Sequence, residues 1–296
     1  MSLNRRQFVA ASSAALTATL SASALPGTLR AAEEAAEMRL GLVTYLWGKD
    51  MDLPTLLKVC EQSGVLGLEL RTEHAHKVEP NLSKAERAEV RKRFADSPVT
   101  LVGYGSNAQY HEQDPAKVKA NIELTKKYIH LMHDCGGSGV KVKPNALLKD
   151  VPTEKTVEQI GKALNEVAAY GAEHGQEIRV EAHGRGTSDL PIMKAIFDVA
   201  DHRNVGVCWN SNDVDVTGQG LEYNFNLVKN RLATTTHVRE LNLGDYPYPK
   251  LIELLVSTKY NGWVLLECRT NPADKVAAMI EQAKVFDELI AKAKRG

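Results

Sequence analysis

Residues 139–183 read GVKVKPNALLKDVPTEKTVEQIGKALNEVAAYGAEHGQEIRVEAH, and this stretch decides the fold. Apolar and polar residues alternate from Gly139 to Lys143, which is typical of a strand with two different faces. Residues 154–174 then carry apolar side chains at helical spacing, and a second strand-like run begins at Glu177. The order strand, helix, strand predicts two parallel strands joined by a helical crossover.

The same unit recurs along the rest of the chain. Strand-like runs begin near eight residues: Arg39, Val65, Val99, Gly139, Glu177, Val205, Thr235 and Gly262. A helical pattern follows each of them, over residues 53–62, 84–94, 115–134, 154–174, 190–199, 221–232, 248–257 and 273–294. Eight such units close into a barrel without a free sheet edge, so we predict a single α/β domain, a (β/α)8 TIM barrel over residues 38–296. An open doubly wound sheet is the alternative, but no GxGxxG follows the first strand.

Signals for helix ends agree with these patterns. An N-cap residue with proline close to the first turn, or a similar signal, precedes four of the helices, at Asp52, Asp114, Thr153 and Asn271. Glycine follows three helices, where a left-handed residue is favoured, at Gly64, Gly136 and Gly175.

Composition excludes several classes of protein. The chain has 296 residues, of which 43% are hydrophobic, and its 37 basic and 37 acidic residues leave no net charge. A balanced charge does not support nucleic-acid binding, and no long strongly apolar stretch predicts a membrane span. The cysteines form no CxxC pair, which disfavours a zinc ribbon or a disulfide scaffold: Cys60, Cys135, Cys208 and Cys268.

Residues 1–37 differ from the rest of the chain. Asn4-Arg5-Arg6-Gln7-Phe8 precedes a weakly apolar run from Val9 to Leu25, and the small residues Ala22-Ser23-Ala24 lie within that run. This layout resembles a twin-arginine export signal, so we expect a periplasmic or exported protein, with residues 33–37 as an acidic linker. A short amphipathic helix and an uncleaved anchor are the alternatives.

Polar side chains share the inner face of the predicted barrel. Side chains of a strand alternate between its two faces, so counting by two sorts them. If the valines pack on the helices, the inward set comprises Glu69, Arg71 and Glu73 on the second strand, Lys141, Lys143 and Asn145 on the fourth, Arg179, Glu181 and His183 on the fifth, Asn210 and Asn212 on the sixth, His237 and Arg239 on the seventh, and Glu267 and Arg269 on the eighth.

This polarity exceeds what packing requires. Burying an unpaired ionisable group costs several kcal/mol, and active sites of such barrels lie at the C-terminal ends of the strands. We therefore predict a functional role for Glu181, His237 and Glu267, each at the end of its strand. A structural ion-pair network and a functional role are equally consistent with three others: Lys141, Arg179 and Glu69.

Two carboxylates and an imidazole suit one divalent cation such as Mn2+, Mg2+, Co2+ or Zn2+, and the amide oxygen of Asn210 is a fourth candidate ligand. At these strand ends the chain resembles the xylose-isomerase-like sugar isomerase and epimerase barrels, a superfamily that includes endonuclease IV. The resemblance covers the chain from about residue 38 onward. Four motifs carry it: Val180-Glu181-Ala182-His183, Val207-Cys208-Trp209-Asn210, Thr236-His237-Val238 and Leu265-Leu266-Glu267.

The resemblance implies a ligand set for the metal. Glu, Asp, His and Glu hold it in the sugar epimerases, and the matching residues here are Glu181, Asn210, His237 and Glu267. It also implies that Glu181 and Glu267 are the catalytic pair, moving protons on either face of the sugar carbon. Asn210 replaces an aspartate, so the site loses one negative charge and is expected to bind metal more weakly. Three residues are candidates to compensate for it: Asp213, Asp215 and His183.

The expected reaction is isomerisation or epimerisation by proton abstraction next to a carbonyl, with one glutamate removing the proton and the other returning one. Substrate would be bound by Arg71, Lys143, His183 and Asn212. The same first step serves a lyase or hydrolase on 3-keto-sugars, and Asn210 leaves open a non-catalytic carbohydrate-binding barrel.

The expected partner is a small, unphosphorylated carbohydrate. A glycine-rich phosphate cradle is missing after the last two strands, where only Gly244 and Thr270-Asn271-Pro272 occur. Neither nucleic acid nor, after signal cleavage, a membrane is expected as a partner, and a homo-oligomer is left open.

The histidines after the second strand are candidates for a second metal site. His74 and His76 share a face if that strand continues, but a solvated loop is the favoured interpretation. The tri-metal nuclease pattern needs further histidines after the third and seventh strands, and the chain does not supply them.

Overall fold

The structure is a computed structural model, and it describes residues 38–295. The predicted export signal and linker, residues 1–37, lie outside the described residues. Eight long strands alternate with eight α-helices, as the sequence predicts. The strands are β1 (Arg39–Val43), β2 (Gly67–Arg71), β3 (Thr100–Gln109), β4 (Gly139–Lys143), β6 (Glu177–Glu181), β8 (Val205–Cys208), β9 (Thr235–Val238) and β10 (Trp263–Leu266).

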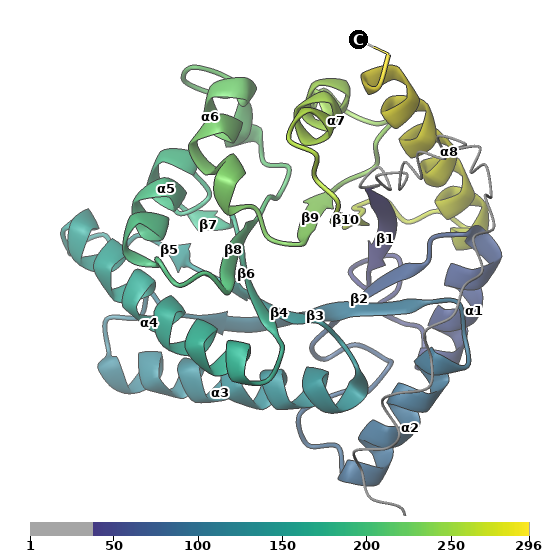
Figure 1. The fold of residues 1–296 in the computed structure, drawn as a ribbon, viewed down its shortest axis with the longest axis horizontal. Helices are drawn as coiled ribbons and strands as arrows, with labels where there is room; N and C mark the ends of the chain where they lie inside the picture. The colour runs from purple at the N-terminus through teal and green to yellow at the C-terminus, as the bar shows by residue number, and fades with distance from the viewer. Residues whose placement is uncertain (1–37, 296) are drawn as a thin grey trace, which may run out of the picture. The chain divides into compact units, whose positions relative to one another are not determined.

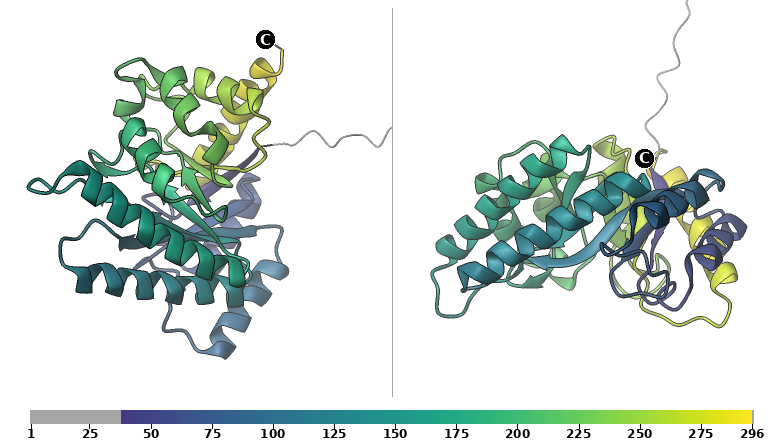
Figure 2. Two further views of the ribbon diagram at one scale, coloured as in Figure 1. Left: turned by 60° about the vertical axis from the view of Figure 1, so that its left-hand side comes forward. Right: turned by 90° about the horizontal axis from the view of Figure 1, so that it is seen from below.

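The helices match the predicted ranges to within a few residues at each end. They are α1 (Leu53–Ser63), α2 (Lys84–Ala95), α3 (Pro115–Cys135), α4 (Thr153–Glu173), α5 (Leu190–Val199), α6 (Leu221–Val228), α7 (Tyr248–Ser257) and α8 (Lys275–Ala293). Short 3-10 turns, η1 (Asp213–Val216) and η2 (Lys229–Arg231), flank α6. Figure 1 shows the helices on the outer side of the strands, and in both views of Figure 2 α3 and α4 lie side by side.

The strands form a nearly closed parallel barrel. The order of hydrogen-bonded neighbours is β8-β6-β4-β3-β2-β1-β10-β9. The ends of this sheet, β8 and β9, meet through bridges at Val207–Leu232 and Asn210–His237. The predicted TIM barrel is therefore confirmed, and the open doubly wound sheet is excluded.

Two of the four predicted N-caps are confirmed. The carboxylates of Asp52 and Asp114 accept hydrogen bonds from backbone N–H groups in the first turns of α1 and α3. The prediction at Asn271 is wrong, because Asp274 caps α8 and Asn271 instead accepts a hydrogen bond from Lys275. The prediction at Thr153 is wrong by one residue, since Pro152 precedes the helix and offers no side-chain cap.

The barrel interior has two layers of different character. One part is filled by a cluster of apolar side chains: Val43, Val102, Trp263 and Leu265. The other part, near the N-terminal ends of β3, β4 and β6, is polar. Arg179 extends into this end and donates to the backbone oxygen of Val102 at 2.9 Å, to Ser138 Oγ at 2.8 Å and to Glu177 at 2.8 Å. Arg179 is thereby a structural residue, which resolves one of the alternatives left open by the sequence.

A second, two-stranded sheet at the C-terminal end was not predicted. β5 (Asn145–Ala146) pairs with β7 (Gly184–Arg185) and joins the loops after β4 and β6. A Cβ atom at Gly184 would lie 1.8 Å from the carbonyl oxygen of Asn145, and Gly184 has φ of 101°, so only glycine permits this approach. The pairing holds the segment that follows Lys143 against the segment that follows His183. Over residues 38–295, no helix combines the length and apolar character that membrane crossing needs.

Candidate functional site

Glu181, His237 and Glu267 converge at the C-terminal end of the barrel. Each offers one ligand atom, and these atoms lie within 4.8 Å of one another. Glu181 and His237 are buried, and Glu267 is partly exposed. Within residues 38–295 this is the one group of three acidic, histidine or cysteine residues with that spacing. We call it the Glu-His-Glu cluster.

Strand register brings the three residues together. Glu181 ends β6 beside Cys208 of β8, and Asn210 bridges to His237 of β9. His237 in turn pairs with Leu265 of β10, two residues before Glu267. Because side chains alternate along a strand, these residues share the inner face, as counting by two predicted.

Both carboxylate oxygens of Glu181 accept hydrogen bonds from the protein. The buried ammonium of Lys141 binds Oε2, and Nδ2 of Asn210 donates to Oε1 at 2.8 Å. Burial opposes ionisation of Glu181, but Lys141 together with His237, His183 and Lys143 outweighs it and holds the pKa of this carboxyl well below its usual range. In return, Glu181 raises the pKa of Lys141 despite its burial. Each carboxylate oxygen keeps a second lone pair for another ligand.

Glu267, just after β10, is held by Arg71 of β2, and only β1 lies between these two strands in the sheet. Nη1 of Arg71 lies 2.9 Å from its Oε1, and the guanidinium carbon of Arg71 lies 5.0 Å from the centre of the Tyr45 ring. The other oxygen of Glu267 is 3.8 Å from Nδ1 of His237. Arg71, predicted to bind substrate, therefore contacts the cluster directly.

His237 lies between two carboxylates. Its Nε2 is 3.2 Å from Oε1 of Glu69, and both side chains are fully buried. Burial lowers the pKa of His237, but Cys208 and Glu69 beside it raise it well above its ordinary value. No hydrogen bond satisfies Nδ1 or Nε2. An unpartnered imidazole nitrogen that converges with two carboxylates is a donor set that a divalent metal can bind, so these residues fit such an ion.

The remaining predicted substrate-binding residues lie around this centre with different partners. Nζ of Lys143 is 3.4 Å from the amide oxygen of Asn107, and Nδ1 of His183 is buried without a hydrogen-bond partner. Burial and the neighbouring Lys141 lower the pKa of Lys143 to about 8. Asn212 donates its amide to the backbone oxygens of Ala182 and Asn210, at 2.7 and 2.9 Å. Its substrate-binding role stays a prediction.

The residues proposed to compensate for Asn210 have other contacts. Asp215 accepts hydrogen bonds through Oδ2 from the hydroxyl of Tyr246 at 2.7 Å and from the backbone of Asn212 at 2.9 Å. Asp213 is largely exposed and lies 3.5 Å from Arg239. Neither belongs to the Glu-His-Glu cluster.

The two histidines after β2 have structural partners. Nδ1 of His74 lies 3.0 Å from the hydroxyl of Thr44, and the ring of His76 contacts the backbone of Arg71 and Val78. The described residues hold no second three-residue cluster that would include them. The segment is a loop, as interpreted from the sequence, although His76 within it is buried.

The sequence analysis did not predict the contact between Glu240 and the loop after β10. The carboxylate of Glu240 accepts backbone hydrogen bonds from Arg269 at 3.0 Å and Thr270 at 2.7 Å. Burial opposes ionisation of Glu240, but its bonds to Thr270 prevail and lower its pKa. The loop after β10 thus has its amide groups occupied by an anion of the protein itself. No local motif indicates this contact, because the residues are about thirty positions apart.

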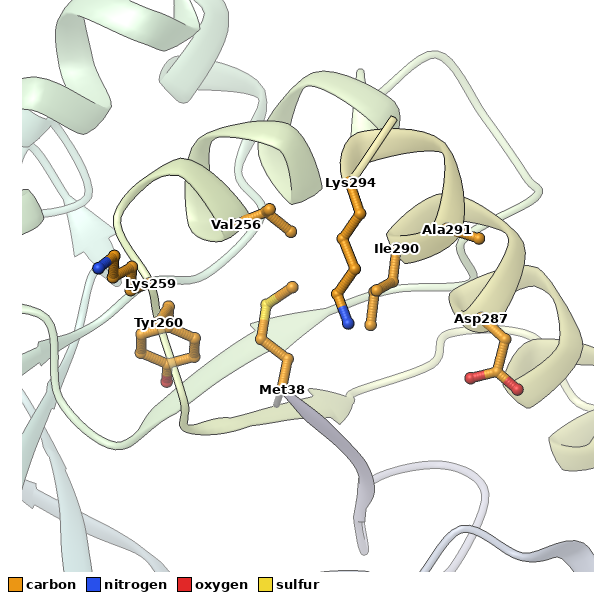
Figure 3. Close-up of a pocket in the computed structure, with 8 residues that line it drawn as sticks. All are labelled: Met38, Val256, Lys259, Tyr260, Asp287, Ile290, Ala291 and Lys294. Carbon is orange, nitrogen blue, oxygen red and sulfur yellow. The ribbon is translucent and has the colours of Figure 1, made fainter. Parts of the chain in front are cut away.

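A pocket of about 280 Å³ lies at the opposite end of the barrel, between α7, α8 and the start of β1. Figure 3 shows its lining, which comprises Met38, Val256, Lys259, Tyr260, Asp287, Ile290, Ala291 and Lys294. None of these residues belongs to the Glu-His-Glu cluster.

Solved structures share this barrel at low sequence identity. An L-ribulose 3-epimerase superposes with a TM-score of 0.73 at 14% identity, covering 88% of this chain and 96% of that one. The IolI protein, solved with a zinc atom, gives 0.72 at 14% identity, over 86% of this chain and 99% of that one. The 3-keto-D-glucoside 4-epimerase YcjR from E. coli gives 0.70 at 12% identity, over 85% and 100%.

At the level of sequence, no curated protein matches the chain significantly. The family described as the xylose isomerase-like TIM barrel matches residues 57–289, which is most of the chain. The chain therefore belongs to the xylose isomerase-like TIM barrel family.

Proposed function

We propose that this protein is a sugar isomerase or epimerase that acts on an unphosphorylated sugar or keto-sugar. The observation that carries the proposal is the Glu-His-Glu cluster at the C-terminal end of the barrel. Such barrels place their active sites at this end, and the cluster combines a divalent-metal donor set with two carboxylates able to move protons.

The two glutamates are suited to a proton transfer at one carbon atom. Glu181 is kept ionised by Lys141, which makes it a base that is ready to accept a proton. Glu267 comes from a different strand and is oriented by Arg71. One carboxylate removes the proton beside the carbonyl, and the other returns a proton to the same or the adjacent carbon.

Glu181, His237 and Glu267 would hold a divalent metal, with Asn210 as the fourth predicted ligand. The bound metal would supply Lewis-acid polarisation of the substrate carbonyl. Asn210 donates its amide N–H to Glu181, so it orients that carboxylate in addition to any ligand role. Glu69 beside Nε2 of His237 leaves Nδ1 directed at the cluster.

The similar folds support this kind of chemistry. Two of the compared proteins are described as epimerases of sugars, and IolI was solved with zinc. These proteins share at most 14% sequence identity with this chain. The proposal of a sugar substrate and a bound metal therefore rests on the residues of the site.

An unphosphorylated substrate is supported by the contact of Glu240. Barrel enzymes commonly bind phosphate with the loops after the last two strands. Here the backbone amides of Arg269 and Thr270 already bind the carboxylate of Glu240. A phosphate at that place would have to displace a buried anion. The predicted export signal, which we propose directs the protein to the periplasm, independently favours free or oxidised sugars, because sugar phosphates are mostly cytoplasmic metabolites.

The test is deuterium exchange. The purified protein, analysed for metals by plasma mass spectrometry, is incubated in D2O with a panel of free keto-sugars and 3-keto-glycosides. We expect deuterium at the carbon beside the carbonyl, with loss of both exchange and metal in Glu181→Ala. Exchange accompanied by release of a leaving group would indicate the lyase instead. Binding without exchange would indicate a carbohydrate-binding barrel.

A further inference from the structure

Three cationic side chains gather around the Glu-His-Glu cluster. In strand register, Gly105 of β3 lies between Arg71 of β2 and Lys141 of β4. A Cβ atom at Gly105 would meet Arg71 Cγ at 3.1 Å and Lys141 Cε at 3.3 Å, so the two side chains approach each other over a position without a side chain. Lys143 follows Lys141 on the same face of β4.

Lys143 differs from the other two cations. Lys141 is paired with Glu181 and Arg71 with Glu267. Within residues 38–295, Lys143 forms no ion pair, and its closest polar partner is the amide oxygen of Asn107 at 3.4 Å. It is nevertheless close enough to the centre for Lys141, Glu181 and Glu267 to influence its pKa. A half-buried cation without a carboxylate partner is costly unless a ligand supplies the anion.

When His237 is neutral, as it must be to bind a metal, the charges of the protein groups at the centre balance. Three carboxylates, those of Glu69, Glu181 and Glu267, stand against three cations: Arg71, Lys141 and Lys143. With His237 neutral, a divalent metal held by the cluster would therefore leave an excess of two positive charges. A neutral sugar offsets none of this excess, whereas an anionic substrate does.

The anion is better matched to a carboxylate than to a phosphate ester. The loop amides that would cradle a phosphate bind Glu240. Lys143 presents a single ammonium, and His183 beside it adds an imidazole nitrogen without a partner. One ammonium and one imidazole suit a singly charged, planar group.

We infer that the substrate is a sugar acid, and that Lys143 binds its carboxylate at the mouth of the Glu-His-Glu cluster. This inference rests on the proposed function for the identity of the substrate as a sugar. It adds the charge of the substrate and a residue that determines specificity.

The test compares ligands that differ only in this group. Calorimetric titrations of the full chain, loaded with Mn2+, use three matched sets: ethylene glycol with glycolate, D-glucose with D-glucuronate, and D-galactose with D-galacturonate. The 6-phosphates of both sugars form a fourth set. We expect at least one acid to bind about tenfold or more tightly than its neutral partner, and the difference to shrink at high salt.

Two variants locate the effect. Lys143→Met keeps the apolar stem, so it should weaken binding of the acid far more than binding of its neutral partner and thereby remove the preference for the acid. Lys143→Arg should retain the preference. Lys162→Met, which removes an exposed lysine of α4, is the matched control and should behave as the wild type.

Several results would overturn the inference. One is that no acid, glycolate included, binds more tightly than its neutral partner. Another is that a 6-phosphate binds more tightly than the corresponding uronate. A third is that Lys143→Met keeps the full preference. Deuterium exchange distinguishes the two proposals. Exchange on neutral sugars alone would contradict the sugar-acid substrate and support the isomerase. Tight binding of acids without exchange would support acid binding by Lys143 and contradict the isomerase.

Discussion

Arg179 and Lys141 are register neighbours on adjacent strands, and both are buried cations inside the barrel, yet they extend toward opposite ends. Arg179 is satisfied by Glu177 and by neutral oxygen atoms near the N-terminal ends of the strands. Lys141 binds Glu181 at the C-terminal end, beside residues with unused hydrogen-bonding capacity. The first cation completes a structural network, whereas the second belongs to a site.

The distribution of unpartnered polar atoms shows the same difference. Buried side-chain atoms without a hydrogen bond are rare in proteins, because each costs about 1–3 kcal/mol. Most of those among the described residues lie on strands, at Glu69 and His237, or in the segments that follow strands, at His183, Asp215 and Arg239. These unpartnered groups lower the free energy of unfolding, which is expected where a ligand binds.

The largest effect is expected from Glu267→Gln. Glutamine preserves the shape and can still accept a hydrogen bond from Arg71, but it cannot transfer a proton. We expect deuterium exchange to fall by about 10³-fold or more, with a melting temperature near that of the wild type. Full activity of the folded variant would contradict the role of Glu267 and weaken the distinction between the two ends.

The second prediction compares the two buried cations. Lys141→Met and Arg179→Met each leave buried polar partners unpaired, so each should lower the free energy of unfolding by about 3–5 kcal/mol. Mn2+ should restore part of this loss in Lys141→Met, because a metal at the cluster replaces the positive charge beside Glu181. It should have no such effect on Arg179→Met. Urea unfolding with and without Mn2+ measures both, and equal responses would contradict the comparison.

The contrast between these residues also shows how far sequence reasoning reaches. The alternation of strands and helices was sufficient to predict the barrel. Counting side chains by two along each strand predicted that both cations lie on the inner face. The sequence pattern could not predict toward which end of the barrel each side chain extends, since the local patterns around Lys141 and Arg179 are alike. The direction depends on distant residues: Gly103 and Gly139 make room for Arg179, whereas Gly105 does so for Lys141. Only the assembled barrel brings these glycines next to the long side chains.

The third prediction concerns the pH dependence of stability. Burial raises the pKa of Asp215 to about 7, against hydrogen bonds that act in the opposite direction. Between pH 4 and pH 7 the folded state therefore binds the proton more tightly than the unfolded state, so this group makes stability fall as the pH rises. The fall amounts to about 4 kcal/mol and ends above pH 7. Asp215→Asn should lack this component in urea unfolding from pH 4 to pH 8. Identical slopes in both proteins would show that Asp215 is ionised throughout.

The smallest effects are expected from two glycines of β3, which test the two ends of the interior with the same substitution. In Gly103→Ala the new methyl group would lie 2.6 Å from Nη1 of Arg179 and 2.6 Å from the backbone oxygen of Gly139. The backbone cannot yield cheaply, so we expect a loss of about 1–3 kcal/mol in the free energy of unfolding.

In Gly105→Ala the contacts are longer, 3.1 Å to Arg71 Cγ and to Glu69 Oε1 and 3.3 Å to Lys141 Cε, and all belong to side chains that can shift by a few tenths of an ångström. The cost in stability should therefore stay below about 1 kcal/mol. Arg71 and Lys141 orient the carboxylates of the cluster. Their displacement should therefore raise the KM or slow the deuterium exchange, each by less than about tenfold. The two variants are expected to separate stability from activity: Gly103→Ala unfolds more easily with unchanged exchange per folded molecule, and Gly105→Ala shows the opposite. If both variants lose stability and exchange together, the interior acts as one unit, and the division between a structural end and a functional end is wrong.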